Sequence, residues 1–113
     1  MSTTRVTFPR HPSELPQKID PVAAYVEAIS KHSAVRQLIL FGSRAVGDNW
    51  PRSDVDMAVL YDGDGKVWSE IEVAARDAWT LIPIDLVDYD RTSGAFRAAI
   101  DRHGRIVYER SES

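Results

Sequence analysis

Two aspartates, Asp54 and Asp56, stand two residues apart at the start of an apolar segment that runs to Tyr61. In an extended segment the side chains of residues i and i+2 emerge on the same face, so both carboxylates point the same way. Two like charges this close repel each other, and burial adds to the cost unless a cation or a proton compensates. Mg²⁺ binds carboxylates together with the phosphates of a substrate. The pair therefore indicates a metal site.

A second chemical signal precedes the aspartates. The apolar run from Leu38 to Phe41 ends in Gly42-Ser43. A glycine lets the backbone approach a ligand closely, and a serine hydroxyl can donate a hydrogen bond to a phosphate. No GxxxxGK[ST] motif occurs, so a P-loop is excluded as the phosphate-binding element. A carboxylate pair facing a Gly-Ser turn predicts a site for a metal and a nucleotide.

The apolar periodicity predicts an α/β (α+β) fold, a small mixed β-sheet with helices packed on it. Strands are expected at 38–41, 55–61 and 84–87, with a final edge strand at 105–109. Helices are expected from the Asp20 cap to about residue 32, over 67–82 before a proline, and from a Thr92 or Ser93 cap to Gly104. One short helical turn, capped by Ser43, is expected in the loop at 42–52. His11, His32 and His103 lie in an arm or at helix ends, which indicates surface positions.

The connections predict how these elements bring the polar residues together. The helix between the second and third strands has the length of a crossover between parallel neighbours. Parallel strands begin at the same end of a sheet, which places Asp85 beside Asp54 and Asp56. If the first strand is antiparallel to the second, its Gly-Ser end reaches the same place. Asp88 has the opposite strand parity to Asp85 and is interpreted as a solvated residue.

Length and composition narrow the possible classes of protein. The chain has 113 residues, which predicts one folded domain over 20–113 after an extended or flexible N-terminal arm, residues 1–19, that holds three of the six prolines. The net charge of −3 gives no general reason for direct nucleic-acid binding, and the absence of cysteine excludes disulfides and thiolate zinc sites. No signal peptide or apolar run of about 20 residues is visible. We expect a cytoplasmic protein without a membrane partner.

The Gly-Ser pair and the aspartates together are a more specific signal than either motif alone. A Gly-Ser pair, ten further residues and Asp-x-Asp, with apolar strands on both sides and Asp85 after a helix, resembles the signature of the DNA-polymerase-β-like nucleotidyltransferase superfamily. Within it, the short chain is similar to the minimal nucleotidyltransferases (MNT), the antitoxin half of HEPN and MNT toxin–antitoxin pairs. The resemblance covers residues 36–90 well and implies a nucleotidyltransferase domain with a palm-like fold over 20–113.

The resemblance also implies roles for the carboxylates and for the turn. Asp54, Asp56 and Asp85 are expected to be the catalytic residues and to bind two Mg²⁺ ions, with Asp85 completing the second metal site and orienting the acceptor hydroxyl. Nucleotide binding is expected from the turn and its flank, by Gly42, Ser43 and Arg44. Val46 stands where a second arginine is common in the family, which removes one expected contact with a phosphate or a partner.

The implied reaction transfers AMP from ATP to a hydroxyl, by resemblance a tyrosine, of a separately encoded helical HEPN toxin. Such a small domain has little chain left to grip an acceptor, so a partner must present it. Two alternatives stay open: an antitoxin that neutralises its partner by binding alone, and an enzyme that modifies a small hydroxyl compound. The sequence leaves open the preferred base, the number of AMP units and the stoichiometry of the complex.

Overall fold

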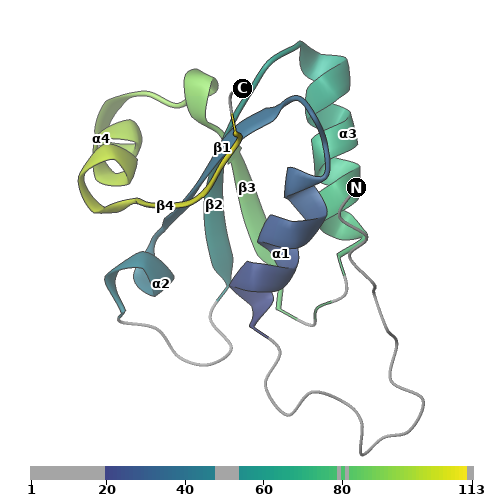
Figure 1. Ribbon diagram of the computed structural model, residues 1–113. Coiled ribbons are helices and arrows are strands. Elements are labelled where there is room, and N and C mark those ends of the chain that lie inside the picture. Colours follow the sequence, from purple (N-terminus) through teal and green to yellow (C-terminus); the bar gives the residue numbers. More distant parts are fainter. Residues whose placement is uncertain (1–19, 48–53, 79, 81, 112–113) are drawn as a thin grey trace, which may run out of the picture.

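The computed structural model describes residues 20–47, 54–78, 80 and 82–111 (Figure 1). The expected arm, residues 1–19, lies outside the described residues, and so does the loop at 48–53. The described elements, in chain order, are α1 (Pro21–Ser30), β1 (Val35–Phe41), α2 (Ser43–Val46), β2 (Val55–Tyr61), α3 (Gly65–Arg76), β3 (Ile84–Asp88), the 3-10 helix η2 (Tyr89–Arg91), α4 (Gly94–His103) and β4 (Arg105–Glu109). Every expected helix and strand is present, and η2 is an addition.

The described strands form one mixed sheet in the order β3-β2-β1-β4. β2 and β3 are parallel, as the crossover helix predicts, and β1 is antiparallel to both β2 and β4. The mixed sheet and the parallel pair are therefore confirmed. Because β1 runs opposite to β2, the C-terminal end of β1 lies at the same end of the sheet as the starts of β2 and β3.

Helices cover both faces of this sheet, with α1 and α3 on one side and α4 on the other (Figure 1). The larger core lies under α1 and α3, where Ile29 and Ile71 pack on Leu38 and Met57, all four at 0% exposure. A smaller core lies under α4 and joins Ile100 to the sheet. Burying one such large apolar side chain contributes about 1.5–3 kcal/mol, so the larger core dominates the stability of the fold.

The alternation of side chains along β2 decides which face carries the acidic residue. Val55, Met57 and Val59 belong to the core under α1 and α3. Ala58 belongs to the core under α4. Since successive side chains of a strand point to opposite faces, Asp56 shares the face of Ala58 and lies on the α4 side.

Helix ends follow the capping residues of the sequence. Asp20 caps α1, accepting hydrogen bonds from the amides of Val22 at 3.0 Å and Ala23 at 3.4 Å, with Pro21 as the first helical residue. α3, with 12 residues, is the longest of the described helices. None of those described helices is long and apolar enough to cross a membrane.

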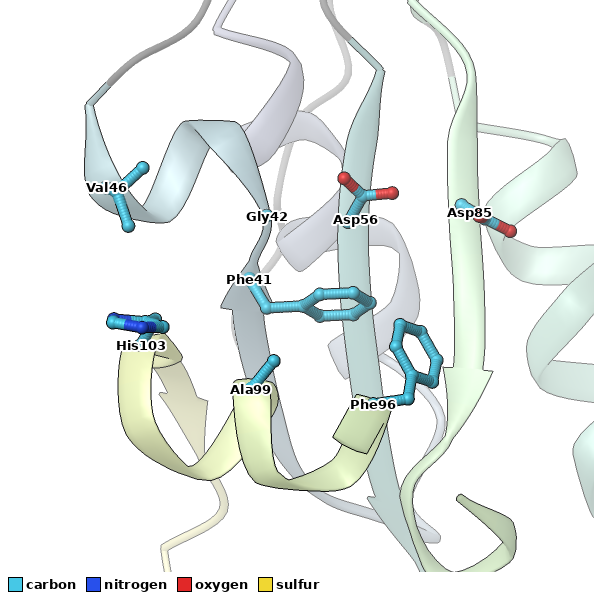
Figure 2. A pocket seen from close by; sticks show the side chains of 8 residues that line it. All are labelled: Phe41, Gly42, Val46, Asp56, Asp85, Phe96, Ala99 and His103. Carbon is cyan, nitrogen blue, oxygen red and sulfur yellow. The ribbon is translucent and has the colours of Figure 1, made fainter. Parts of the chain in front are cut away.

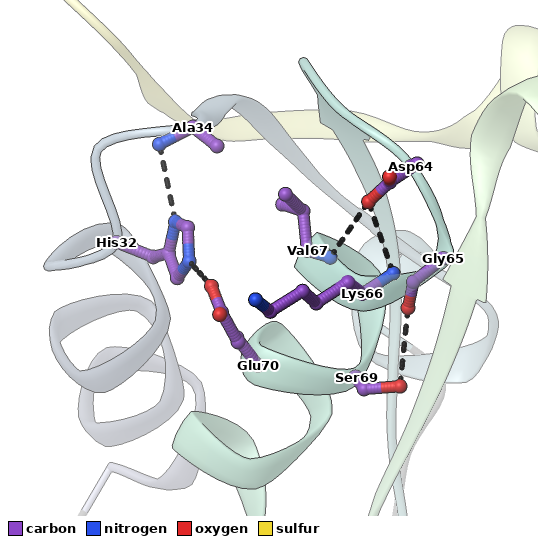
Figure 3. A network of polar contacts seen from close by, with 8 residues as sticks. All are labelled: His32, Ala34, Asp64, Gly65, Lys66, Val67, Ser69 and Glu70. Carbon is purple, nitrogen blue, oxygen red and sulfur yellow. Dashed lines mark hydrogen bonds and ion pairs between the residues drawn. The ribbon is translucent and has the colours of Figure 1, made fainter.

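A polar contact joins the turn that follows α1 to α3 (Figure 3). The His32 ring accepts a hydrogen bond from the Ala34 amide at Nδ1 (3.1 Å) and contacts Glu70 through Nε2 (2.8 Å). Since Nδ1 accepts, Nε2 carries the proton and donates to the carboxylate. Asp64 caps α3 and accepts from the Lys66 amide at 3.1 Å, as Figure 3 also shows.

Several element ends differ from the prediction. α3 ends at Arg76 rather than before Pro83, because the Tyr25 hydroxyl binds the carbonyl of Ile82 and the Val55 amide binds that of Pro83 at 2.9 Å. These contacts tie Ile82 to α1 and Pro83 to the start of β2. β1 begins at Val35, earlier than expected, since Val35 is fully buried.

Two polar residues also depart from the prediction. Ser43 does not cap α2, because Gly42 is the N-cap residue and Ser43 is the first residue of the helix. Asp88 is not solvated: its side chain is 12% exposed, and its Oδ2 accepts a hydrogen bond from the Tyr61 hydroxyl at 2.7 Å. Asp88 is thus engaged in holding β3 to β2.

Candidate active site

A pocket of about 460 Å³ opens at the end of the sheet where β1 ends and β2 and β3 begin (Figure 2). The sheet contributes Phe41, Asp56 and Asp85 to its lining, and the following turn and α2 contribute Gly42 and Val46. Two of the three expected catalytic carboxylates and the Gly of the Gly-Ser turn thus lie around one cavity.

Asp56 and Asp85 are neighbours across the parallel pair. Their Cα atoms are register partners of β2 and β3, and Phe41 of β1 is the partner of Asp56 on the other side. Directly paired residues of adjacent strands present their side chains on the same face. Figure 2 shows both carboxylates at the rim of the pocket, with that of Asp85 turned away from that of Asp56. Asp85 lies on an edge strand and is exposed.

The electrostatics of Asp56 reflect this crowding. Burial raises the pKa of the Asp56 carboxyl above its ordinary value, and the charges of Asp85 and then Asp54 raise it further. A raised carboxyl pKa means that the surroundings disfavour the ionised form. A cation placed among these oxygens would relieve the disfavoured charge.

Gly42 brings the backbone of the turn against Asp56. It has a positive φ of 77°, and a Cβ atom built there would overlap Oδ2 of Asp56. A side chain at this position would therefore both strain the backbone and displace the carboxylate. The absence of a Cβ permits the close approach that the Gly-Ser motif predicts, although here the close neighbour is a protein carboxylate.

Asp54, Ser43 and Arg44 lie beside this pocket without lining it. Asp54 directly precedes β2 and is exposed. Its charge contributes to the raised pKa of Asp56. The pKa of Tyr25 is also raised, mainly by burial and then by the charge of Asp54. Ser43 and Arg44 are the first two residues of α2 and are half-buried.

The carboxylate oxygens at this pocket are suitable ligands for Mg²⁺, but they do not form a complete coordination shell. Within the described ranges, no group of three or more histidine, cysteine, aspartate or glutamate side chains is close enough to hold a metal ion. Asp56 and Asp85 nevertheless offer adjacent hard oxygen ligands whose mutual repulsion a divalent cation would offset. Mg²⁺ usually takes only one or two protein carboxylates and completes its shell with water and substrate phosphates. Two neighbouring carboxylates are therefore enough for such a site.

α4 supplies the part of the pocket that sequence reasoning missed. Phe96, Ala99 and His103 line it from the helix. The spacing of Phe96, Ala99 and Ile100 predicts an apolar helix face, yet Ile100 is 1% exposed and Phe96 is 48% exposed. His103 is exposed at the end of α4, as its position in the sequence predicts, and it also lines this pocket. Only the placement of α4 over the Asp56 face, which depends on long-range packing, reveals these three residues.

Comparison with known proteins identifies the family of the chain. The sequence profile of the family described as Polymerase beta, Nucleotidyltransferase matches residues 24–113. The chain belongs to this nucleotidyltransferase family. The matched region includes the Gly-Ser turn and the aspartates at 54, 56 and 85. Among curated proteins, no sequence matches that of this nucleotidyltransferase significantly.

Solved structures with a similar fold include three antitoxin complexes. The nucleotidyltransferase is similar to a chain in a toxin–antitoxin structure with AMP-PNP, with a TM-score of 0.59, 21% identity, and coverage of 81% of this chain and 75% of that one. The chain is also similar to one in the structure of a mutant MntA-HpeT toxin–antitoxin pair, with a TM-score of 0.58, 19% identity, and coverage of 81% of this chain and 75% of that one. A third similar structure holds the tri-AMPylated HEPN toxin of Shewanella oneidensis with its MNT antitoxin, with a TM-score of 0.53, 19% identity, and coverage of 80% and 74%. At these identities, the likeness establishes the shared fold.

Proposed function

We propose that this nucleotidyltransferase transfers AMP from ATP, in a Mg²⁺-dependent reaction, to a tyrosine hydroxyl of a HEPN-type toxin, and so acts as its antitoxin in the cytoplasm. The observation that carries the proposal is the pairing of Asp56 with Asp85 beside Gly42, in a chain of the nucleotidyltransferase family. Solved structures of the same fold that hold AMP-PNP or an AMPylated toxin support the choice of nucleotide and partner.

The carboxylates have distinct parts in this proposal. Asp54 and Asp56, at the start of β2, would hold the metal that accompanies the nucleotide, and Asp56 and Asp85 would hold the second. When bound, two Mg²⁺ ions stabilise the charge on the attacking and leaving oxygens of a displacement at phosphorus. Asp85 is exposed on the edge strand β3, which suits a residue that meets an incoming acceptor.

The chemistry balances with groups of this chain and its substrates. The hydroxyl oxygen of the acceptor attacks the α-phosphorus of ATP, the bond from that phosphorus to the β-phosphate oxygen breaks, and pyrophosphate leaves. Asp85 takes the hydroxyl proton as general base or orients the hydroxyl. Gly42 and Ser43 would contact the phosphates through the backbone and the serine hydroxyl, and Arg44 would supply a positive charge.

The acceptor follows from the small size of the domain. Most large apolar side chains of the described region are used in its own two cores, and no second lobe is present among the described residues to grip an acceptor. A partner protein that presents its own hydroxyl supplies what this domain lacks. The product would be a tyrosine-AMP phosphodiester on the toxin.

ATP labelled at the α-phosphate tests the proposal. The full chain, Mg²⁺ and a HEPN-type toxin, sought as a small helical protein encoded by a neighbouring gene, are incubated with this ATP, and label retained on the partner is measured. Retained α-label, without retention of γ-label, is the expected result. Asp56→Asn should lose the transfer, whereas Asp77→Asn, a matched exposed carboxylate at the end of α3, should keep it. An unlabelled partner that stays bound and neutralised would instead establish inhibition by binding alone.

A further inference from the structure

The α4 wall of the pocket has no part in the carboxylate and phosphate roles. Phe96 is a large apolar residue of this wall, yet it is 48% exposed. Ile100, one turn further along α4, is 1% exposed and joins the helix to the sheet through Phe41 and Ala58. The helix is therefore anchored by Ile100, and Phe96 presents apolar surface to the pocket.

Phe41 holds the ring of Phe96 in a defined position. The two ring centroids are 5.5 Å apart, with an angle of 80° between the planes, which is the edge-to-face arrangement that aromatic pairs favour. Phe41 is 7% exposed and belongs to β1, so its own position is fixed by the sheet. Figure 2 shows the two rings below Asp56, with Phe96 on the side toward Asp85. This pair forms an aromatic surface at the pocket.

The rest of the pocket fits a flat ring that carries polar groups. Its volume of about 460 Å³ lies within the usual range for small-molecule sites. Ala99 and Gly42 have little or no side chain and leave room beside the aromatic surface. Asp56 and Asp85 lie at the rim, where ionised carboxylates act only as acceptors of hydrogen bonds. A flat ring would match the apolar wall, while the carboxylates at the rim beside it serve the metal in the proposed function.

We propose that Phe96, held by Phe41, binds a planar aromatic ring of a substrate beside Asp56 and Asp85. This inference deepens the proposed function and rests on it, since it names how the site recognises one substrate. The proposed reaction offers two sources of such a ring, the base of the nucleotide and the phenol of the tyrosine acceptor. Both present the same chemistry to Phe96, a flat apolar face with polar groups at its edge.

Binding of three probes to the full chain in Mg²⁺ buffer tests the subsite. The probes are ATP, inorganic triphosphate, which lacks a ring, and N-acetyl-tyrosinamide, and their titrations are followed by NMR. Phe96→Ala should weaken one of the ring-bearing probes about tenfold while leaving triphosphate unchanged, and Phe96→Trp should keep the affinity. Val73→Ala is the matched control, because Val73 is 45% exposed and lies on α3, on the other side of the sheet.

A second variant covers the case in which Phe96→Ala fails to fold. Ala99→Leu fills the pocket from an exposed helix position without creating a cavity, and it should weaken the same probe. A loss for ATP assigns the subsite to the base, and a loss for N-acetyl-tyrosinamide assigns it to the acceptor. Unchanged affinity for both ring-bearing probes, or an equal loss for triphosphate, overturns the inference.

The outcome is separable from that of the proposed function. If ring binding depends on Phe96 but no AMP is transferred to the partner, the ring-binding subsite is supported and the proposed reaction is contradicted. If AMP is transferred and Phe96→Ala binds all three probes like the wild type, the proposed reaction is supported and the ring-binding subsite is contradicted.

Discussion

Gly42 and Asp56 approach so closely that a methyl group on Gly42 would overlap the Asp56 carboxylate. This contact joins the end of β1 to the start of β2 at the rim of the pocket. The position of the carboxylate therefore depends on a residue that has no side chain of its own.

The first prediction concerns Gly42→Ala. The variant should lose measurable binding of Mg-ATP and be less stable by about 1–3 kcal/mol before the overlap is counted, since Gly42, at φ 77° and ψ −157°, has a backbone conformation essentially confined to glycine. Gly47→Ala is the control, because Gly47 has a φ of 80° but no atom of the described residues within 4 Å of the added methyl group. Thermal unfolding and calorimetry of both variants measure the difference. Equal effects of the two substitutions would show that the contact with Asp56 is unimportant.

The second prediction separates stability from activity at Asp56. Burial and two neighbouring carboxylates disfavour the charge of Asp56, so Asp56→Asn should raise the Tm of the metal-free protein at neutral pH by a few degrees. The wild type should gain stability from Mg-ATP by mass action, and the variant should not. Thermal scans with and without Mg-ATP measure both effects. A variant that is stabilised by Mg-ATP as strongly as the wild type would remove Asp56 from the metal site.

The third prediction assigns Asp85 to the acceptor. Asp85→Asn should bind Mg-ATP nearly as well as the wild type yet transfer AMP at least tenfold more slowly, which corresponds to about 1.4 kcal/mol of transition-state stabilisation. Nucleotide affinity and single-turnover transfer to the partner are measured as a pair. Transfer at the wild-type rate would make Asp85 a bystander. Asp88 could not readily replace it, since Tyr61 already binds its Oδ2.

The fourth prediction is a pH dependence at Tyr61. Burial, and then the hydrogen bond to Asp88, raise the pKa of Tyr61 to about 12. Between its ordinary pKa of 10.0 and about 12, the native state keeps the phenol proton while the unfolded state loses it. The stability that this difference contributes is fully present below pH 10 and is lost as the pH rises toward 12.

Tyr61→Phe should therefore lose less stability than the wild type over that pH range. At neutral pH the variant should be less stable by about 1 kcal/mol, because it removes a half-buried hydrogen bond from Asp88. Urea unfolding at about pH 9 and about pH 11 measures how much the free energy of unfolding falls with pH in the wild type and in the variant. Parallel losses in the wild type and in Tyr61→Phe would contradict the assignment.

Much of the fold could be predicted because local sequence decides it. The bounds of β2, 55–61, are confirmed, since an apolar run between an aspartate and an Asp-Gly turn has few alternatives. The cap at Asp20 and the helix end at Gly104 are confirmed for similar local reasons. The parallel pairing of β2 with β3 follows from the length of the connecting helix, and it places Asp85 beside Asp56.

The features that could not be predicted depend on contacts between distant residues. α3 ends early because Tyr25 and Val55 bind the carbonyls of Ile82 and Pro83, and no local pattern shows those contacts. Phe96 looks like a core residue from its spacing, but the placement of α4 on the sheet leaves it at the pocket. The placement of Asp56 beside Asp85 could be predicted from the sequence, whereas the α4 wall of the pocket could not.

The mass of the intact partner protein tests the central claim most directly. A HEPN-type toxin, sought as a small helical protein encoded beside this chain, is co-expressed with the wild-type chain or with Asp56→Asn, purified and weighed by mass spectrometry. The account predicts a partner that is heavier by one or more AMP units with the wild type and unmodified with the variant. A partner that is unmodified in the presence of the wild type, yet still neutralised by it, would contradict the claim that the chain acts as an AMP transferase.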